Sequence, residues 1–170
     1  MGNVLITKQT GKKGKIVNRI FIEVGCDIDR EFYLSLLVDR NNSKLMMMIS
    51  AAGGMDIEEV AVTNPEKIIN VHFTTYKDIS LDESLMTKLE ITKNQLAELT
   101  SIVNKLVNAF NSIDASTIEI NPLVLNKQGS FVVLDAKISL DDNALFRHPE
   151  LADLKDLTEE DPLELQAAEH

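Results

Sequence analysis

Two short stretches on either side of position 128 carry polar side chains that could hold a divalent cation. Glu119 and Asn121 stand two residues apart in a run of branched apolar residues, and Asp135 and Lys137 repeat that spacing farther along the chain. Mg²⁺ prefers oxygen ligands, keeps several waters and is usually held by one or two protein groups together with substrate phosphates. Asn121 and Asp135 offer such a pair of oxygens. The pattern therefore predicts a magnesium site at these two residues.

A β-hairpin would bring the two stretches together. Gly129 closes the loop 126–129, which predicts two strands paired about a centre near position 128. That register sets Asn121 opposite Asp135 and Glu119 opposite Lys137. Side chains alternate across a strand, so all four share one face, and directly opposed residues have Cβ atoms about 5 Å apart. Within the hairpin of 117–139, the four polar groups are predicted to gather at its open end.

A simpler interpretation of the same hairpin needs no metal. Glu119 and Lys137 would form a cross-strand ion pair on a solvated strand end, worth under about 1 kcal/mol. The alternation also assigns the apolar residues to faces. We expect the polar face to become apolar toward the turn, and the other face to be apolar throughout; the first set is Leu123, Leu125, Phe131 and Val133, and the second is Ile118, Ile120, Val132 and Leu134.

The remaining elements are predicted from periodicity, turn residues and caps. Strands are expected over Val4–Thr7, Val17–Val24, Glu31–Arg40 and Lys44–Ile49, the last two as a hairpin, and residues 68–73 are expected to be extended. A short helix over Asp56–Val62 should end before Asn64-Pro65. The clearest helix runs from Lys93 to Asn111 with an apolar stripe, and Thr92 with Gln95 predicts a capping box at its start.

Composition limits the classes of partner. The chain has 170 residues, a formal net charge of -10 and a pI near 4.7, which disfavours nucleic acid and anionic membranes as partners. The single cysteine, Cys26, suits a reducing compartment, and no secretory signal or membrane-length apolar run is visible. The chain stops inside an expected helix, Pro162–His170, so we expect it to be a piece of a longer protein.

Short motifs follow one another along nearly the whole chain: Lys8-Gln9-Thr10-Gly11, Val17-Asn18-Arg19, Glu31-Phe32-Tyr33-Leu34, Val38-Asp39-Arg40, Ile118-Glu119-Ile120-Asn121-Pro122-Leu123, Asp142-Asn143-Ala144-Leu145-Phe146-Arg147 and Glu160-Asp161-Pro162-Leu163-Glu164. In this order they resemble one enzyme family, the β subunit of succinyl-CoA synthetase. Each motif alone is weak, but their shared order makes a chance match very improbable.

The resemblance implies a partial ATP-grasp fold over 1–170, of the α/β (α+β) class, with a mostly antiparallel sheet and packed helices. It implies a reversible ligase that joins succinate to coenzyme A with ATP or GTP and Mg²⁺, through a phosphohistidine on a partner α subunit. The implied compartment is the bacterial cytoplasm or the mitochondrial matrix. Asn121 and Asp135 match the family's magnesium ligands, and Glu119 matches an acid that meets the phosphohistidine loop, with the Lys137 ion pair as an equal alternative.

The resemblance also assigns the nucleotide contacts. Glu23 and Cys26 match positions along the adenine and Glu31 matches the ribose-side acid, although Cys26 could be a small buried apolar residue and Glu31 a strand-edge charge. The chain departs from the family at Ala52, where glutamate usually precedes the glycine pair.

The family's glycine-rich phosphate-covering segment and its flavodoxin-like domain would lie outside 1–170, so we expect this chain to be inactive alone. A malate-CoA ligase, the amino-terminal part of ATP citrate lyase and a non-catalytic nucleotide-binding or subunit-interaction module are the alternatives.

Overall fold

A computed structural model of the chain describes residues 2–7 and 10–154. The strands are β1 (Val4–Leu5), β2 (Lys15–Ile16), β3 (Ile28–Asp39), β4 (Lys44–Ser50), β5 (Ile69–Phe73), β6 (Ala115–Asn126), β7 (Phe131–Val133) and β8 (Ala136–Leu140). The helices are α1 (Ile57–Thr63), α2 (Ser84–Leu89), α3 (Lys93–Ser112) and α4 (Pro149–Ala152), with short 3-10 helices η1 (Pro65–Lys67) and η2 (Asp142–Arg147). None of the described helices is long and apolar enough to cross a membrane.

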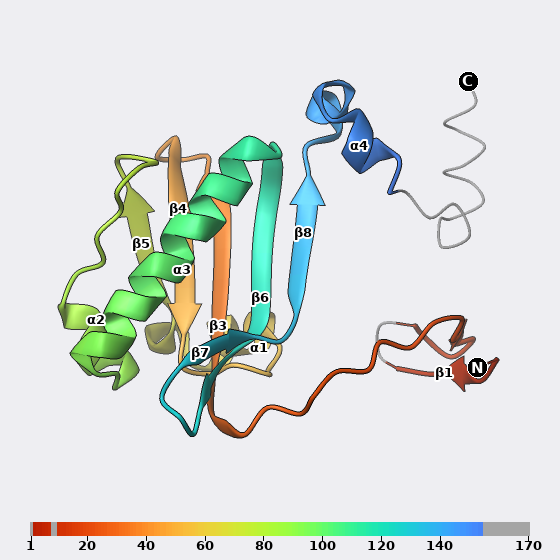
Figure 1. Ribbon diagram of the computed structural model, residues 1–170, viewed down its shortest axis with the longest axis horizontal. Helices are drawn as coiled ribbons and strands as arrows, with labels where there is room; N and C mark the ends of the chain where they lie inside the picture. Colours follow the sequence, from red (N-terminus) through yellow and green to blue (C-terminus); the bar gives the residue numbers. More distant parts are fainter. Residues whose placement is uncertain (1, 8–9, 155–170) are drawn as a thin grey trace.

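The centre of the fold is a six-stranded sheet with the order β5-β4-β3-β6-β7, in which β8 also pairs with β6. Every strand pair in it is antiparallel. The β1–β2 hairpin stands apart and is joined to β3 by a long extended connection (Figure 1). The predicted class, a mostly antiparallel sheet with packed helices, is confirmed.

Helix α3 covers one face of the sheet and shields the core. Its predicted capping box is present, because the Thr92 side chain accepts from the Gln95 backbone N–H and the Gln95 side chain accepts from the Thr92 N–H. The buried positions of its apolar stripe lie against buried strand residues. They are Leu96, Leu99, Val103, Val107 and Phe110 on the helix, with Leu34, Leu36, Met47, Ile49, Ile118 and Ile120 among those on the strands.

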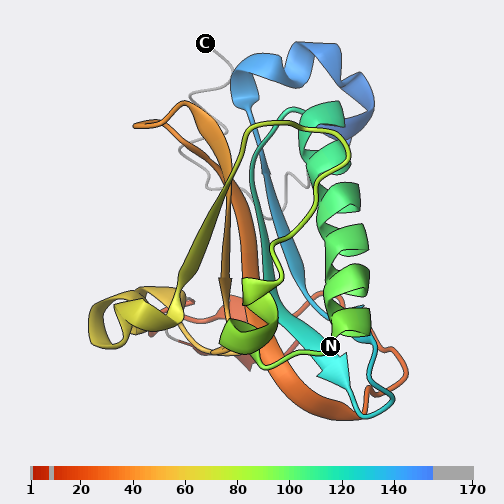
Figure 2. The same cartoon turned by 90° about the vertical axis from the view of Figure 1, so that its left-hand side faces the viewer.

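The other face of the sheet is covered only in part. Helix α1 lies on this side, opposite α3, near one end of the sheet (Figure 2). Its N-cap is Asp56, whose carboxylate accepts from the Glu58 backbone N–H, and it ends at Thr63, before Asn64-Pro65 as predicted. We call this side the open face. It carries the alternate residues of β3 and β6, which include Tyr33, Ser35 and Glu119.

One predicted strand is wrong. Residues 17–27 form no strand, and the backbone of Val17 alone bonds to Gly2 and Asn3, although Val17–Val24 is rich in branched residues. A strand needs a neighbour to take its backbone hydrogen bonds, and no strand pairs with residues 18–27 in the described part of the chain. Its apolar side chains consequently face solvent, with Phe21 85% exposed.

Most of the other predicted elements are present in the structure. The hairpin of β3 and β4, helix α1, strand β5 and helix α3 are confirmed within a few residues, whereas α2 was not predicted at all. Lys8-Gln9 of the first motif, the motif at 160–164 and the helix expected over Pro162–His170 lie outside the described residues.

Asp39 at the end of β3 provides a test of this fold in solution. Its carboxylate accepts from the Asn42 side chain and faces the His72 Nε2 atom, both at 2.7 Å. These two contacts, the Asn42 bond first, lower the pKa of Asp39 from 3.8 to about 2. A lowered pKa in the folded state stabilises the fold above the unfolded pKa, and that contribution is lost as the pH falls toward the folded pKa.

We therefore expect Asp39→Asn to lower the free energy of unfolding at pH 7 and to make little difference near pH 2. Urea unfolding of both proteins across this pH range measures the effect, with exposed Asp153→Asn as the control. A difference that stays constant down to pH 2 would show that the carboxylate contacts are not formed in solution.

Candidate functional site

The Asn121 side chain on β6 is held in one orientation by a neighbouring turn. Its Oδ1 atom accepts from the Gly54 backbone N–H at 2.8 Å, and its Nδ2 atom donates to the Met55 carbonyl at 3.1 Å. The amide oxygen has two lone pairs, so one remains for a further partner. Asn121 is therefore a partly exposed strand residue whose amide oxygen has a fixed orientation and could bind a cation.

Asp135 lies beside Asn121, as the hairpin register predicts. The Asn121 backbone N–H donates to the Asp135 carbonyl at 3.3 Å, and Glu119 lies directly opposite Lys137. The same register continues on the other side, where Leu123 lies opposite Val133. Asp135 is exposed to solvent. The predicted pairing is thus confirmed, while metal binding by the pair stays a prediction.

The predicted assignment of apolar residues to faces is wrong beyond Asn121. Leu123, Leu125 and Phe131 join the same core as Ile118 and Ile120, instead of sharing the face of Glu119. The cause is an irregularity in the pairing of β3 with β6, where the register shifts between Phe32 and Leu34. A bulge of this kind moves every following side chain to the other face. Val133, expected to be buried, is exposed.

Glu119 lies on the open face among other polar groups. It is opposite Ser35 on β3, and both Glu119 and Glu58 of α1 raise the pKa of Tyr33 by charge, after the larger effect of burial. Ser35 is 1% exposed, and its side chain lies against the Tyr33 hydroxyl, a contact that partly offsets the raised pKa of Tyr33. Glu119 also lies directly opposite Lys137, so the two interpretations of Glu119 both stay predictions.

Glu31 reaches the same turn from β3. The Gly53 backbone N–H donates to the Glu31 carbonyl at 3.1 Å, and the Glu31 carboxylate lies against Gly54. A Cβ atom added to Gly54 would be 2.7 Å from Glu31 Oε2. The structure therefore brings Glu31 and Asn121 to the two sides of one short turn.

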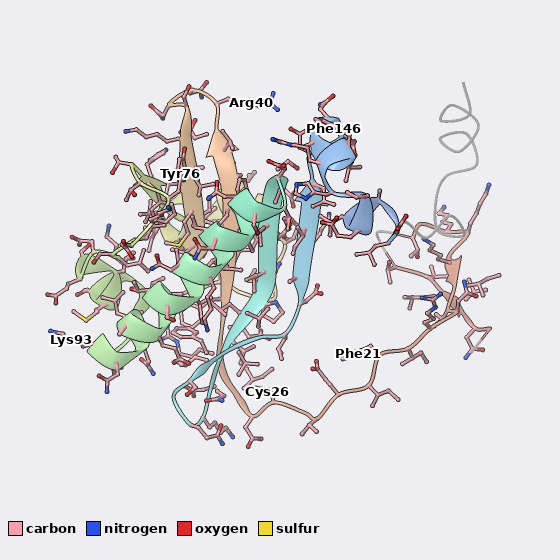
Figure 3. All side chains as sticks on the ribbon, turned by 45° about the horizontal axis from the view of Figure 1, so that its top comes forward. Phe21, Cys26, Arg40, Tyr76, Lys93 and Phe146 are labelled. Atoms are coloured by element: carbon pink, nitrogen blue, oxygen red, sulfur yellow. The ribbon has the colours of Figure 1, made fainter. Side chains whose placement is uncertain are left out.

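Glu23 and Cys26 are not brought to this cluster. Both belong to the extended connection before β3, where Glu23 is exposed and Cys26 is partly buried. Figure 3 shows the connection running away from the sheet between Phe21 and Cys26. Their nucleotide contacts stay a prediction.

Sequence reasoning missed the turn and part of the open face. Ser35 and Glu58 belong to none of the motifs, and neither the motif that contains Tyr33 nor the glycine pair of the turn indicated a contact with Asn121. Alternation along β3 could have found Tyr33 and Ser35, because they share a face with Glu31. The contact of the turn with Asn121 joins residues 67 positions apart, which no local pattern reveals.

The donor set of Asn121 and Asp135 fits magnesium better than a metal that needs a closed protein cage. Both groups offer oxygen, the preferred ligand atom of Mg²⁺. The described residues contain no group of three or more His, Cys, Asp or Glu side chains that could hold a metal ion. Two ligands leave positions for water and phosphate oxygens.

Tyr33 offers a spectroscopic test of the open face. Burial and the carboxylates of Glu119 and Glu58 raise its pKa above 10.0, because both disfavour the phenolate. The chain has two tyrosines, and Tyr76 is exposed. In a Tyr76→Phe variant, where Tyr33 is the only tyrosine left, we expect tyrosinate absorbance to rise with a midpoint above pH 10.0. A midpoint at or below pH 10.0 would contradict the burial of Tyr33 beside these acids.

Comparisons with known proteins place this geometry in a family. The sequence profile of the ATP-grasp domain matches residues 1–125. Subunits named succinate–CoA ligase [ADP-forming] subunit beta align with 100% of the chain: it is 49% identical to that of Acidiphilium cryptum, 46% to that of Paramagnetospirillum magneticum and 47% to that of Bartonella quintana. The chain spans 43% of each relative's length.

Among solved structures, the ATP citrate lyase of Methanothrix soehngenii, in complex with citrate and coenzyme A, has a similar fold. The TM-score is 0.59 at 17% identity, over 92% of this chain and 34% of that one. At this identity the likeness speaks for the fold alone. Together with the profile match over most of the sequence, it shows that the chain belongs to the ATP-grasp domain family, and that it is related along its whole length to the β subunits of ADP-forming succinate–CoA ligases.

Proposed function

We propose that the chain is the nucleotide- and magnesium-binding part of a succinate–CoA ligase, which joins succinate to coenzyme A and converts ATP to ADP and phosphate. The observation that carries the proposal is the identity of 45 to 49% along the whole chain to subunits of that name. The relatives are named as ADP-forming, which favours ATP over GTP as the nucleotide. The parent enzyme would work with an α subunit that carries the phosphohistidine.

In this proposal Asn121 and Asp135 supply the protein oxygens for Mg²⁺. The bound ion would neutralise charge on the phosphates of the nucleotide. The contribution of the chain is then positional: the hairpin register sets the two ligands side by side, and the turn beside Asn121 fixes its amide oxygen.

The other predicted residues take supporting roles. Glu31 would meet the ribose, and Glu23 with Cys26 would lie along the adenine. Glu119 would orient the imidazole of the α subunit and stabilise its charged form. Its place on the open face, beside Tyr33 and near Glu58, supports this role. Because the relatives are bacterial, we propose the bacterial cytoplasm as the compartment.

A chimeric ligase tests the proposal. Residues 1–170 replace the matching part of the Acidiphilium cryptum β subunit, which is produced with the α subunit of the same organism and assayed for ADP release that requires both succinate and coenzyme A. We expect the chimera to turn over. A chimera that assembles with the α subunit, as judged by gel filtration, yet releases no ADP would contradict the proposal. An acid-substrate profile of the complete parent protein separates succinate from malate and citrate.

A further inference from the structure

Three hydrogen bonds connect β3 to β6 through the turn of Gly53, Gly54 and Met55, which we name the Gly53–Met55 turn. Gly53 donates its backbone N–H to the Glu31 carbonyl, Gly54 donates its N–H to Asn121 Oδ1, and Met55 accepts from Asn121 Nδ2. One end of the turn is thus fixed on the strand of the predicted ribose-side acid, and the other on the side chain of the predicted metal ligand.

Both glycines are required by the space around the turn. A Cβ atom on Gly53 would lie 2.3 Å from the Phe32 backbone nitrogen and 2.4 Å from the Glu31 carbonyl carbon, so any side chain there forces the turn away from β3. Gly54 has a φ of +69°, a backbone conformation that L-residues rarely adopt. Its missing side chain also leaves room for the Glu31 carboxylate. The glycine pair is therefore a condition for the close approach.

We propose that the Gly53–Met55 turn is the positioning element of the metal site. It holds the Asn121 amide so that one lone pair of Oδ1 remains for the cation, and it couples that ligand to Glu31. This inference rests on the proposed function. Groups that orient a metal ligand from behind are known to matter almost as much as the ligand itself.

The chemistry of the two contacts makes asparagine irreplaceable by aspartate. The Met55 carbonyl accepts from Nδ2 and so prevents the amide from turning its nitrogen toward the cation. Aspartate has no donor for that carbonyl, and two oxygens would face each other there. Aspartate would nevertheless be the stronger ligand for Mg²⁺ on charge alone. If positioning by the turn dominates, Asn121→Asp weakens binding of the cation. If charge dominates, the same substitution strengthens it.

The turn also accounts for the family departure at Ala52. All three contacts of the turn use its backbone groups. The Ala52 backbone N–H additionally donates to the Ser50 hydroxyl at 3.2 Å. Alanine in place of the usual glutamate therefore leaves the positioning of Asn121 intact.

The functional test uses Mn²⁺ binding to the chimeric ligase in the presence of ATP, followed by electron paramagnetic resonance. Asn121→Asp and Gly53→Ala should each weaken Mn²⁺ binding by about 10 to 100-fold, the range found when a group that supports a metal ligand is lost. Turnover should recover at high Mg²⁺, because positioning affects the metal requirement more than the maximal rate. The control is Asn126→Asp, the same substitution on β6, where the side chain accepts from the Ser130 backbone N–H in the hairpin loop.

The structural test uses the 170-residue chain alone and needs no activity. The Gly54 amide proton should exchange slowly with solvent in nuclear magnetic resonance spectra, and Asn121→Ala should speed this exchange, whereas Asn126→Ala should not. Unchanged exchange in Asn121→Ala would overturn the proposal even if the chimera is active, and so would Mn²⁺ binding by Asn121→Asp at wild-type strength or tighter. Failure of the unmodified chimera to bind Mn²⁺ with ATP would instead overturn the proposed function, and this inference with it.

Discussion

Asp135→Ala in the chimeric ligase is expected to lower turnover by about 100-fold or more, since even indirect support of a metal ligand is worth about 10 to 100-fold in affinity or activity. The carboxylate is the only charged member of the proposed ligand pair, and it lies beside Asn121 by backbone pairing. Without it, one amide oxygen must hold the cation. Steady-state rates measured over a series of Mg²⁺ concentrations give the effect.

The design separates a lost ligand from a damaged protein. Asp135→Asn keeps an oxygen but loses the charge. Its turnover should therefore lie between that of the unmodified chimera and that of Asp135→Ala, and it should improve as the Mg²⁺ concentration is raised. Asp153→Ala removes an exposed carboxylate of the same chain outside the site and should leave the rate unchanged. Equal rates for Asp135→Ala and Asp153→Ala would rule out a metal role for Asp135 while leaving the family assignment in place.

The hairpin could be predicted from sequence because its information is local. Gly129, with a φ of +85°, closes the loop after Asn126, and the loop length sets the register of both strands. Opposing pairs such as Glu119 and Lys137 follow from that register alone. Helix α3 was predictable for the same reason, since its capping box and apolar stripe both lie within 21 consecutive residues, Thr92 to Ser112.

The faces beyond Asn121 could not be predicted because they depend on a third strand. The hairpin of β6 with β7 and β8 keeps one register from Thr117 to Leu125, so its pairing indicates no change of face beyond Asn121. The shift arises where β6 meets β3, between Phe32 and Leu34, and the two strands are far apart in the sequence. A strict alternation therefore put Leu123 and Leu125 on the wrong side.

The segment before β3 failed for a related reason. Branched residues favour strand geometry only when a neighbouring strand is available. Ile20, Phe21 and Ile22 have the composition of a strand but remain exposed in the described part of the chain. Glu23 and Cys26 lie on this segment. Their predicted nucleotide contacts depend on what packs against the segment, which its own sequence does not indicate.

Leu99→Ala is expected to give the largest loss of stability in the chain. Leu99 is fully buried on α3 and belongs to the core that supports β6 from behind. Removing such a side chain leaves a cavity and costs about 3 to 5 kcal/mol. A domain of this size has only about 5 to 15 kcal/mol of net stability. Urea unfolding followed by circular dichroism measures the change, with the slope of the transition as a check that both proteins unfold in the same way.

Two further variants on the same helix make this result specific. Lys105→Ala removes an exposed side chain and should change the free energy of unfolding by less than about 0.5 kcal/mol. Leu99→Met nearly conserves volume and should cost less than about 1.5 kcal/mol. If Leu99→Ala were no worse than Lys105→Ala, α3 would not pack on the sheet as described. Because Leu99 lies on the face opposite the metal ligands, the folded fraction of Leu99→Ala should still bind Mn²⁺ with ATP as the unmodified chimera does, which separates support of the fold from chemistry at the site.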